Sequence, residues 1–323
     1  MVTPSLILPR QPDERWQQAK QLGVDSVVVH TLEIGDNQSQ WTYDELRAMQ
    51  NWFVDAGLTI DVIEGSVPIP DRVRLGEEGR DADIEVFKQF LRDCGDVGIP
   101  VVCYDWMAGT RWARTEAHLE SRGGSYVTGF DNDKLGSPDH REAADVTADQ
   151  LWEALEYFLE EVTPVAEEAG VKLGLHPDDP PRESLGDMPR IINSPEAYQR
   201  VVDSYDSEHN GITFCQGNFA AMGVDIPETI ERFGEKINFI HFRDVEGDRD
   251  RFVETWHDDG PTDMFAAMHA YETHVDDDVP MRPDHVPTMA GEDNSNPGYH
   301  MLGRLFAIGY MRGLREGSQA LEN

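Results

Sequence analysis

Short apolar runs alternate with longer amphipathic stretches along the whole chain of 323 residues. Eight of the short runs are rich in β-branched and aliphatic residues, which is typical of strands. The predicted strands are Ser5–Leu8, Asp25–Val29, Thr59–Ile63, Pro100–Tyr104, Val171–Leu175, Gly211–Phe214, Ile237–Ile240 and Val279–Arg282.

Each predicted strand is followed by a stretch with helical periodicity. Thr147 and Gly170 are expected to cap the fourth of these helices, and Ser194-Pro195 and Asn296-Pro297 are typical helix starts. The predicted helices are Glu14–Leu22, Asp44–Ala56, Ile84–Val97, Ala148–Ala169, Pro195–Tyr205, Ile226–Phe233, Asp263–Thr273 and Pro297–Arg315.

Eight strand–helix units without a break in composition predict one α/β domain over residues 1–323, a closed (β/α)8 TIM barrel. A doubly wound open sheet is the alternative. The stretch 106–146, after the fourth strand, has little periodicity and is predicted to be a long loop inserted over the mouth of the barrel. Pro177–Asn193 is a second candidate lid.

Four successive predicted strands end in residues that can bind a metal: His176, Cys215, His241 and Asp284. In the fifth strand, an outward apolar row leaves His176 facing into the barrel, and the same alternation turns Cys215 inward in the sixth. Because adjacent strands lie about 4.8 Å apart, these four side chains are expected to meet at the mouth.

Each of these residues also has a simpler interpretation. A lone histidine or cysteine in a strand is more often a buried core residue, and an aspartate after proline can cap a loop. The conjunction of all four favours a metal site. Two imidazoles, a thiolate and a carboxylate suit Zn2+, Fe2+ or Co2+ at least as well as Mn2+, so the residues alone indicate only a divalent first-row metal.

Polar residues beside the predicted ligands form a candidate acid/base pair. His285 follows Asp284 directly, and Tyr299 is expected in the first turn of the last helix, close to the mouth. Their alternative roles are orientation of a ligand for His285 and ordinary packing for Tyr299. Arg243, His257 and Asp258 are candidates for binding a substrate carboxylate or hydroxyls, although all three could be solvated loop residues.

The net charge of the chain indicates the environment in which the protein works rather than the reaction that it catalyses. Acidic residues number 62 against 27 basic ones, which gives a net charge of −35. Such a chain repels itself at low salt, and molar salt screens that repulsion, so the protein is expected in the cytoplasm of a cell with a high internal salt concentration. The charge argues against nucleic acid and anionic membranes as partners.

Other features of the sequence argue against several classes of protein. The three cysteines are too few for a disulfide framework, and the N-terminus lacks the basic region of a signal peptide. Phosphate-binding glycine loops, dinucleotide fingerprints, H-E-x-x-H and nucleophile elbows are missing from the sequence, so nucleotide cofactors and serine hydrolysis are unsupported.

Several strings resemble the mannonate dehydratase family over about Arg72 to Leu314. They include LGLHPDDPP, GITFCQGNFAAMG, INFIHFRDV, ETWHDDGPTDM and RPDHVPTMAGEDNSNPGYH. The resemblance implies His176, Cys215, His241 and Asp284 as ligands of a single Mn2+ or Fe2+ ion, and His285 and Tyr299 as acid/base residues. The first 70 residues, with SLILPRQP in place of an aromatic-rich strand, match the family poorly.

The family reaction converts D-mannonate to 2-keto-3-deoxy-D-gluconate and water, a step in hexuronate catabolism. The expected partner is therefore a small sugar acid, and a homodimer is left open as the assembly. Two other metal-dependent activities are alternatives: dehydration of a related sugar acid, and isomerisation or epimerisation of a sugar. A third is a non-catalytic protein that binds a metal or a sugar acid.

Overall fold

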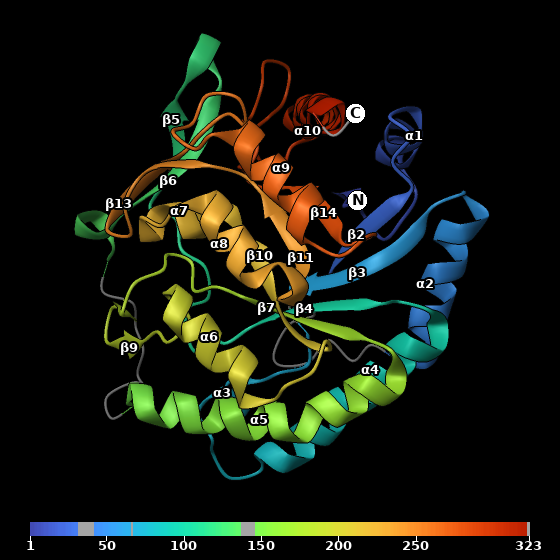
Figure 1. Cartoon of the computed structure of the whole chain (residues 1–323), viewed down its shortest axis with the longest axis vertical. Coiled ribbons are helices and arrows are strands. Elements are labelled where there is room, and N and C mark those ends of the chain that lie inside the picture. The colour runs from blue at the N-terminus through green and yellow to red at the C-terminus, as the bar shows by residue number, and fades with distance from the viewer. Residues whose placement is uncertain (32–41, 66, 137–145, 322–323) are drawn as a thin grey trace.

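Eight parallel strands close into a barrel in the computed structural model, which describes residues 1–31, 42–65, 67–136 and 146–321 (Figure 1). Their order around the barrel is β1-β14-β11-β10-β7-β4-β3-β2, which confirms the predicted (β/α)8 architecture. All eight predicted strands are present, as β1 (Thr3–Ile7), β2 (Ser26–Thr31), β3 (Thr59–Gly65), β4 (Val101–Asp105), β7 (Lys172–His176), β10 (Asn210–Cys215), β11 (Ile237–Phe242) and β14 (Pro280–Pro283).

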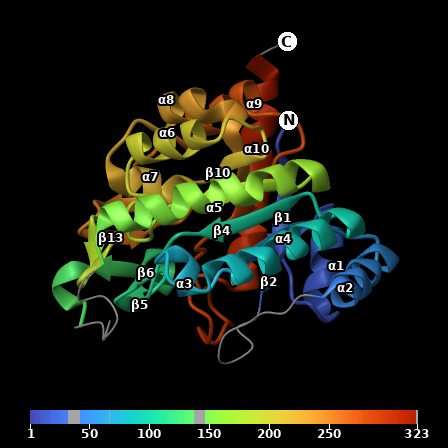
Figure 2. The same ribbon diagram turned by 90° about the horizontal axis from the view of Figure 1, so that it is seen from below.

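Helices surround this barrel, and α4 and α5 lie side by side along one flank (Figure 2). Thr147 caps α5 by accepting a hydrogen bond from the Gln150 backbone, and Gly170 ends it in a left-handed conformation, as predicted. The helices are α1 (Glu14–Gln21), α2 (Tyr43–Asp55), α3 (Asp71–Arg74), α4 (Arg80–Val97), α5 (Ala148–Ala169), α6 (Pro195–Ser204), α7 (Gln216–Met222), α8 (Ile226–Phe233), α9 (Met264–His274) and α10 (Met301–Leu321), with short 3-10 turns at Arg122–Gly124, Asn132–Lys134 and Gly234–Lys236.

The last helix begins later than the sequence predicts. The Asn296-Pro297 pair does not start it, because Gly298 adopts a left-handed φ of 87° that a right-handed helix cannot include. Helix α10 therefore begins at Met301, and Tyr299 lies in the turn before the helix rather than in its first turn.

The stretch after β4 was predicted to be a long loop, but it contains secondary structure. It contains β5 (Glu116–Glu120) and β6 (Tyr126–Asp131), which join β13 (Arg251–Glu254) and β12 (Val245–Gly247) in a four-stranded antiparallel sheet. These strands are short and partly exposed, and the sheet joins segments more than 100 residues apart, so local periodicity did not reveal it. Residues 137–145 of this stretch lie outside the described residues. After β7, the predicted second lid forms a small hairpin of β8 (Ser184–Leu185) and β9 (Met188–Pro189).

The pleat of the barrel strands separates two of the three apolar clusters of the core. A small cluster containing Val28, Val62, Val101, Cys103 and Phe239 fills the inside of the barrel. A much larger cluster lies between barrel and helices, and it contains the alternating residues of β7 and β10 that were predicted to point outward: Leu173, Leu175, Ile212 and Phe214. Position 176 and position 215, which have the opposite parity, are therefore left for the inner face.

One glycine allows α4 to approach the end of α5 closely. A Cβ on Gly95 would lie 2.2 Å from the carbonyl oxygen of Ala169, so Gly95→Ala is expected to lower the free energy of unfolding by about 1–3 kcal/mol. Gly309, in α10, has no atoms within 4 Å of the added Cβ, and Gly309→Ala is expected to raise that free energy by up to about 1 kcal/mol. Urea unfolding in molar KCl measures both changes, and equal effects of the two substitutions would contradict this account.

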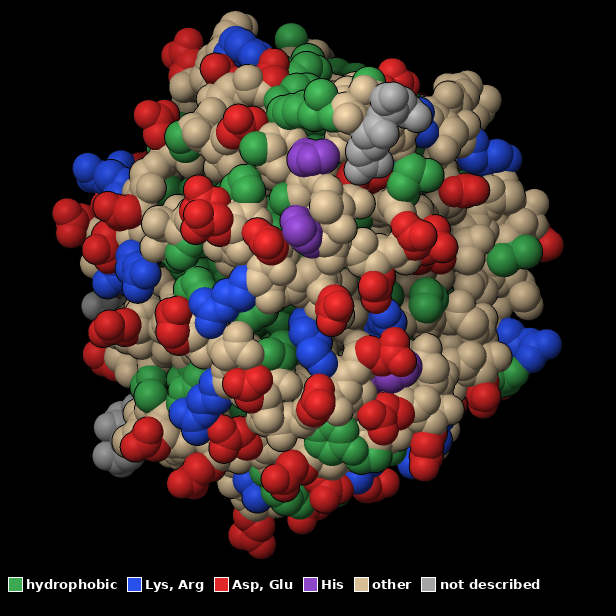
Figure 3. Space-filling model, in the orientation of Figure 1, with side chains coloured by type: hydrophobic (Ala, Val, Ile, Leu, Met, Phe, Trp, Pro, Cys, Tyr) green, Lys and Arg blue, Asp and Glu red, His purple; other side chains and the backbone are tan. Residues whose placement is uncertain are grey.

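On the face of the molecule seen in Figure 3, acidic side chains are spread out rather than gathered in one patch. Every flank visible in that view carries carboxylates, in keeping with the net charge of −35. None of the helices in the described part of the chain has the length and apolar character of a membrane-spanning segment.

Candidate metal centre and active site

A cavity of about 820 Å³ opens where the strands of the barrel end. Both ends of the chain contribute to it: Ile7, His30 and Glu64 come from the first three strands, and Tyr299 and Arg304 from the last segment. The remaining lining residues are Gly65, Cys103, Tyr104, Asp105, Met107, Gly109, Arg111, Trp112, His176, Asp179, Arg282, Asp284 and Asn296. This is the face at which TIM barrels carry their active sites.

Three of the four predicted metal ligands meet at the inner side of this cavity. Cys215 and His241 are paired across β10 and β11, and the rings of His176 and His241 have centroids 5.0 Å apart. One donor atom from each of His176, Cys215 and His241 lies within 4.8 Å of the other two. The strand register thus brings together residues that are far apart in the sequence.

The donor atoms are arranged in a way that suits a divalent cation. The Nδ1 atom of His176 is 2.7 Å from the Pro177 carbonyl oxygen, to which it donates, so Nε2 carries the free lone pair. The Nε2 atom of His241 is buried, makes no hydrogen bond of good geometry with the described residues and lies 3.3 Å from Glu64 Oε1. The Cys215 sulfur accepts a hydrogen bond of 3.3 Å from Arg243 Nε. Two imidazoles and a thiol fit the ligand preferences of first-row transition metals.

Asp284 lies beside this group but is held by two arginines. Its Oδ2 atom is 3.7 Å from His241 Nδ1, 4.0 Å from Cys215 Sγ and 3.2 Å from Nε of Arg243. Its Oδ1 atom accepts a hydrogen bond of 2.6 Å from Arg282. The carboxylate is close enough to join the three donors after a small movement, and its role as the fourth ligand stays a prediction.

A second possible ligand group shares His241. It consists of Glu64, Cys103 and His241, all buried, on the adjacent strands β3 and β4 and on β11, across the barrel from them. However, the Glu64 carboxylate forms an ion pair with Arg282, whose Nε donates to it at 2.8 Å. Arg282 thus already compensates the charge of Glu64. The group with Cys215 also has a guanidinium beside it, Arg243, but it supplies two imidazoles, one of them with a free Nε2 on His176, so it is the better candidate.

Burial controls the protonation of the thiol. Without a metal, burial raises the pKa of Cys215 to about 12, although the adjacent Arg243 guanidinium acts in the opposite direction. The thiolate that a metal requires would therefore form together with metal binding, which releases the proton.

His285 and Tyr299 face each other at the edge of the cavity. The Tyr299 hydroxyl is 3.4 Å from His285 Nε2, and Trp112 packs edge-on against the His285 ring at 5.9 Å between centroids. His285 has a φ of 43°, a left-handed conformation that is unfavourable for a residue other than glycine. This turn explains how Asp284 and His285, although adjacent, both reach the site.

The two side chains differ in protonation. Burial lowers the pKa of His285 to about 4, so the imidazole is neutral at neutral pH. Burial and the Asp284 carboxylate raise the pKa of Tyr299 above its ordinary value, so the phenol keeps its proton. The site therefore combines a neutral proton acceptor with a protonated hydroxyl.

A buried network of charges supports His285. Arg114, from the segment before β5, donates to the Asp179 carboxylate at 2.6 and 3.0 Å, to Glu254 at 2.7 Å and to His285 Nε2 at 3.2 Å. Arg243 forms ion pairs with the same Asp179, at 3.1 Å, and with Glu254. Burial alone would raise the pKa of Asp179, but the two guanidiniums hold it well below its usual range.

The residues predicted to bind substrate do not line the cavity. Arg243 is fully buried beside Cys215 and Asp284, and His257 is buried with Nε2 2.8 Å from the Phe242 carbonyl oxygen. Asp258 forms an ion pair with Arg122 at 3.0 Å, outside the cavity. Substrate binding by these three residues stays a prediction that their placement does not favour.

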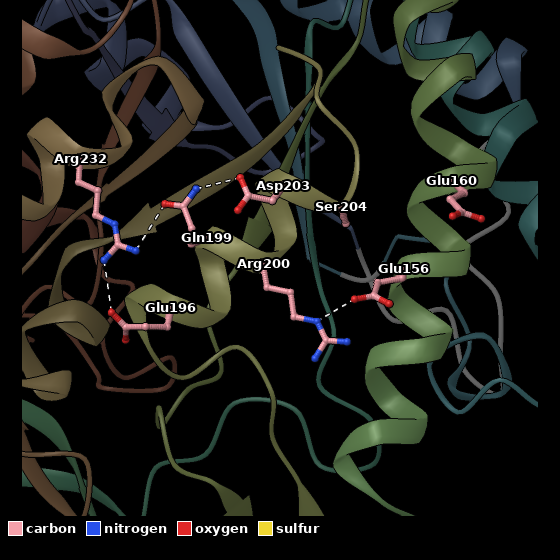
Figure 4. A pocket seen from close by; sticks show the side chains of 8 residues that line it. All are labelled: Glu156, Glu160, Glu196, Gln199, Arg200, Asp203, Ser204 and Arg232. Carbon is pink, nitrogen blue, oxygen red and sulfur yellow. Dashed lines mark hydrogen bonds and ion pairs between the residues drawn. The ribbon is translucent and has the colours of Figure 1, made fainter.

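A second hollow, of about 630 Å³, lies on the outside of the barrel between α5, α6 and α8 (Figure 4). Its arginines already have partners in the same hollow, Arg200 with Glu156 at 2.7 Å and Arg232 with Glu196 at 3.4 Å. It contains none of the predicted site residues, so the cavity at the strand ends remains the candidate active site.

Sequence reasoning missed several residues of the site, chiefly Glu64, Arg114, Asp179, Glu254 and Arg282. Arg282 offered a signal, because a charge inside the apolar strand before Pro283 requires a buried partner. Its partner, Glu64, is 218 residues away in the sequence, so the pair could not be recognised from local pattern.

Comparison with protein families identifies similar proteins along nearly the whole chain. The family model described as D-mannonate dehydratase (UxuA) matches residues 14–144 and 139–323. The similarity therefore reaches into the first 70 residues, where the sequence analysis expected a poor match. Local divergence in the first strand does not prevent alignment of the helices that follow it.

Individual relatives agree with this match. A mannonate dehydratase from Oceanobacillus iheyensis is 34% identical over 316 residues, covering 90% of this chain and 88% of the relative. One from Thermotoga maritima is 34% identical over 338 residues, covering 93% and 92%.

Solved structures extend the comparison to the fold. The crystal structure of mannonate dehydratase from Streptococcus suis superposes with a TM-score of 0.92 at 32% identity, covering 100% of this chain and 96% of that one. A D-tagatose 3-epimerase-like protein, at 12% identity and a TM-score of 0.64, covers 99% of this chain and shares the fold alone.

Proposed function

The chain belongs to the D-mannonate dehydratase family, and we propose that it removes water from D-mannonate to give 2-keto-3-deoxy-D-gluconate. The observation that carries this proposal is a pair of groups, His285 and Tyr299, 3.4 Å apart at a cavity that Tyr299 and His176 line, together with the clustered donors of His176, Cys215 and His241. An acid/base pair beside a cation site is what loss of a proton and a hydroxyl from adjacent carbons requires.

The difficult step is removal of the C2 proton, because the resulting charge must spread onto a carboxylate that is already negative. A divalent cation held by His176, Cys215 and His241, with Asp284 beside them, would act as a Lewis acid that stabilises this charge. We propose Mn2+ or Fe2+, as membership of the family implies, because the mixed nitrogen, sulfur and oxygen donors alone would accept other divalent first-row metals equally well.

Two side chains of the protein carry out the proton transfers. One of His285 and Tyr299 takes the proton from C2, and the other protonates the leaving hydroxyl at C3. Arg114 donates to His285 Nε2 and keeps the imidazole oriented, while the Trp112 ring covers the pair and limits the access of water. The enol that is formed tautomerises to the 2-keto acid.

The test is an assay of purified protein in molar KCl with added Mn2+ or Fe2+ and a set of aldonic acids. We expect 2-keto-3-deoxy acid from D-mannonate. Product from another aldonate alone would indicate a related dehydratase, and a new sugar without 2-keto-3-deoxy acid would indicate an isomerase or epimerase. Binding without any product over hours, shown by titration, would contradict an enzymatic role.

The acidic surface supports a further proposal, that the protein works in a cytoplasm of high salt concentration. With a net charge of −35, the folded chain repels itself unless salt screens the charges, and the Debye length falls to about 3 Å at 1 M salt. The thermal unfolding midpoint is therefore expected to rise steeply between 0.1 and about 2 M KCl. A midpoint that does not change with KCl would contradict this environment.

A further inference from the structure

Arg304 is a buried arginine that forms no ion pair with any residue in the described part of the chain. It lies in the first turn of α10, lines the active-site cavity and is only 5% exposed. Its one hydrogen bond to a described residue runs from Nη1 to the Ile7 carbonyl oxygen, at 2.8 Å. No carboxylate of a described residue forms an ion pair with it.

The other two arginines of the cavity differ in this respect. Arg111 forms an ion pair with Asp105 at 3.2 Å, and Arg282 pairs with both Glu64 and Asp284. Their charges are compensated within the protein. A guanidinium that is buried without such a partner is costly, unless a ligand supplies the missing negative charge.

The surroundings of Arg304 strengthen its preference for an anion. Burial and the nearby Arg282 lower the pKa of Arg304 to about 10, which still leaves it charged at neutral pH. It also lies at the N-terminal end of a helix of 21 residues, where the helix dipole contributes further positive potential.

Its position relative to the reacting groups fits a specific part of the substrate. The Arg304 guanidinium carbon is 5.8 Å from the centre of the Tyr299 ring. A carboxylate bound by Arg304 would therefore place the adjacent carbons, C2 and C3, next to Tyr299 and His285.

We propose that Arg304 binds the carboxylate of the sugar-acid substrate, an inference that rests on the proposed function. The guanidinium offers the planar fork of donors that matches a carboxylate. The same group stabilises the charge that accumulates on the carboxylate as the C2 proton leaves. Arg304 is then both a binding residue and a contributor to the rate.

The experiment measures binding of D-mannonate by calorimetry in Mn2+-loaded protein at molar KCl, in a Tyr299→Phe background so that substrate is not consumed. Adding Arg304→Met is expected to weaken binding about 10- to 100-fold, and Arg304→Lys is expected to weaken it less. In protein that keeps Tyr299, Arg304→Met is expected to raise KM by a similar factor.

Arg312→Met is the matched control, because Arg312 lies on the same helix, donates to the Gly23 carbonyl oxygen at 3.0 Å and is remote from the cavity. It removes the same charge and is expected to leave binding within about threefold of the parent. Metal content is measured in every variant, to separate loss of substrate binding from loss of metal.

Two results would overturn the proposal. One is binding by the Arg304→Met protein within about threefold of the parent. The other is a loss of kcat with unchanged binding, which would mean that Arg304 acts by positioning Tyr299 rather than by binding the carboxylate. If the methionine variant does not fold, Arg304→Gln carries the same expectation, because it keeps a donor and removes the charge. Failure of the proposed function would appear separately, as wild-type protein that forms no 2-keto acid from D-mannonate.

Discussion

Replacing Tyr299 with phenylalanine is expected to lower turnover of D-mannonate at least about a hundredfold while the protein keeps its metal. The substitution removes only the hydroxyl, which lies 3.4 Å from His285 Nε2 and lines the cavity. The ring remains to pack against Trp112 and Arg304, so the fold and the candidate ligands should be undisturbed. Initial rates of 2-keto acid formation, with metal content measured by mass spectrometry, give the result.

Tyr310→Phe is the control for this substitution. Tyr310 is on α10, stacks on Phe306 and does not line the cavity. Removal of its hydroxyl should change turnover by less than about twofold, since surface changes of this kind usually have small effects. A Tyr299→Phe protein with near wild-type turnover would remove Tyr299 from the proton transfers.

Cys215→Ala is expected to weaken metal binding by at least about tenfold to a hundredfold and to lower turnover with it, because it removes one of three clustered donors. In protein loaded with Co2+, the charge-transfer absorption of a cobalt–thiolate bond should also disappear. Metal retained per chain after dialysis against a weak chelator measures the affinity.

Cys103→Ala distinguishes the two possible ligand groups. Cys103 is also buried inside the barrel, but it belongs to the alternative group with Glu64, whose carboxylate is neutralised by Arg282. Its loss is expected to leave metal binding within a few-fold of wild type. If Cys103→Ala lost the metal and Cys215→Ala kept it, the cation would have to be assigned to the alternative group.

The barrel could be predicted because its determinants are local. Each strand is a short apolar run, each helix has its own periodicity and caps, and the repetition of the two leaves few architectures. Two details could not be predicted: Gly298 delays the start of α10, and the short strands β5 and β6 are stabilised by pairing with each other and, through β6, with β13 rather than by their own pattern.

The candidate site could be predicted in part, for a related reason. Strand parity brings His176 and Cys215 inward, and the structure places their donors with that of His241. The arginine and carboxylate partners were missed because most of the pairs join distant segments, as Arg114 and Glu254 do across 140 residues. Such pairs depend on which loops meet above the barrel, and a single sequence does not record that.

Closure of the barrel has a consequence for the order of events during synthesis and folding of the protein. Strand β14 lies between β1 and β11, so the cylinder stays open until the segment that ends at Pro283 of 323 residues has docked. His285 and Tyr299 come later still along the chain. In a partly synthesised chain on the ribosome, the side chains of His176, Cys215 and His241 are therefore not yet enclosed by a closed barrel, and such an open site does not discriminate between metal ions. We therefore expect these donors to bind an ion selectively only after β14 has docked and closed the barrel.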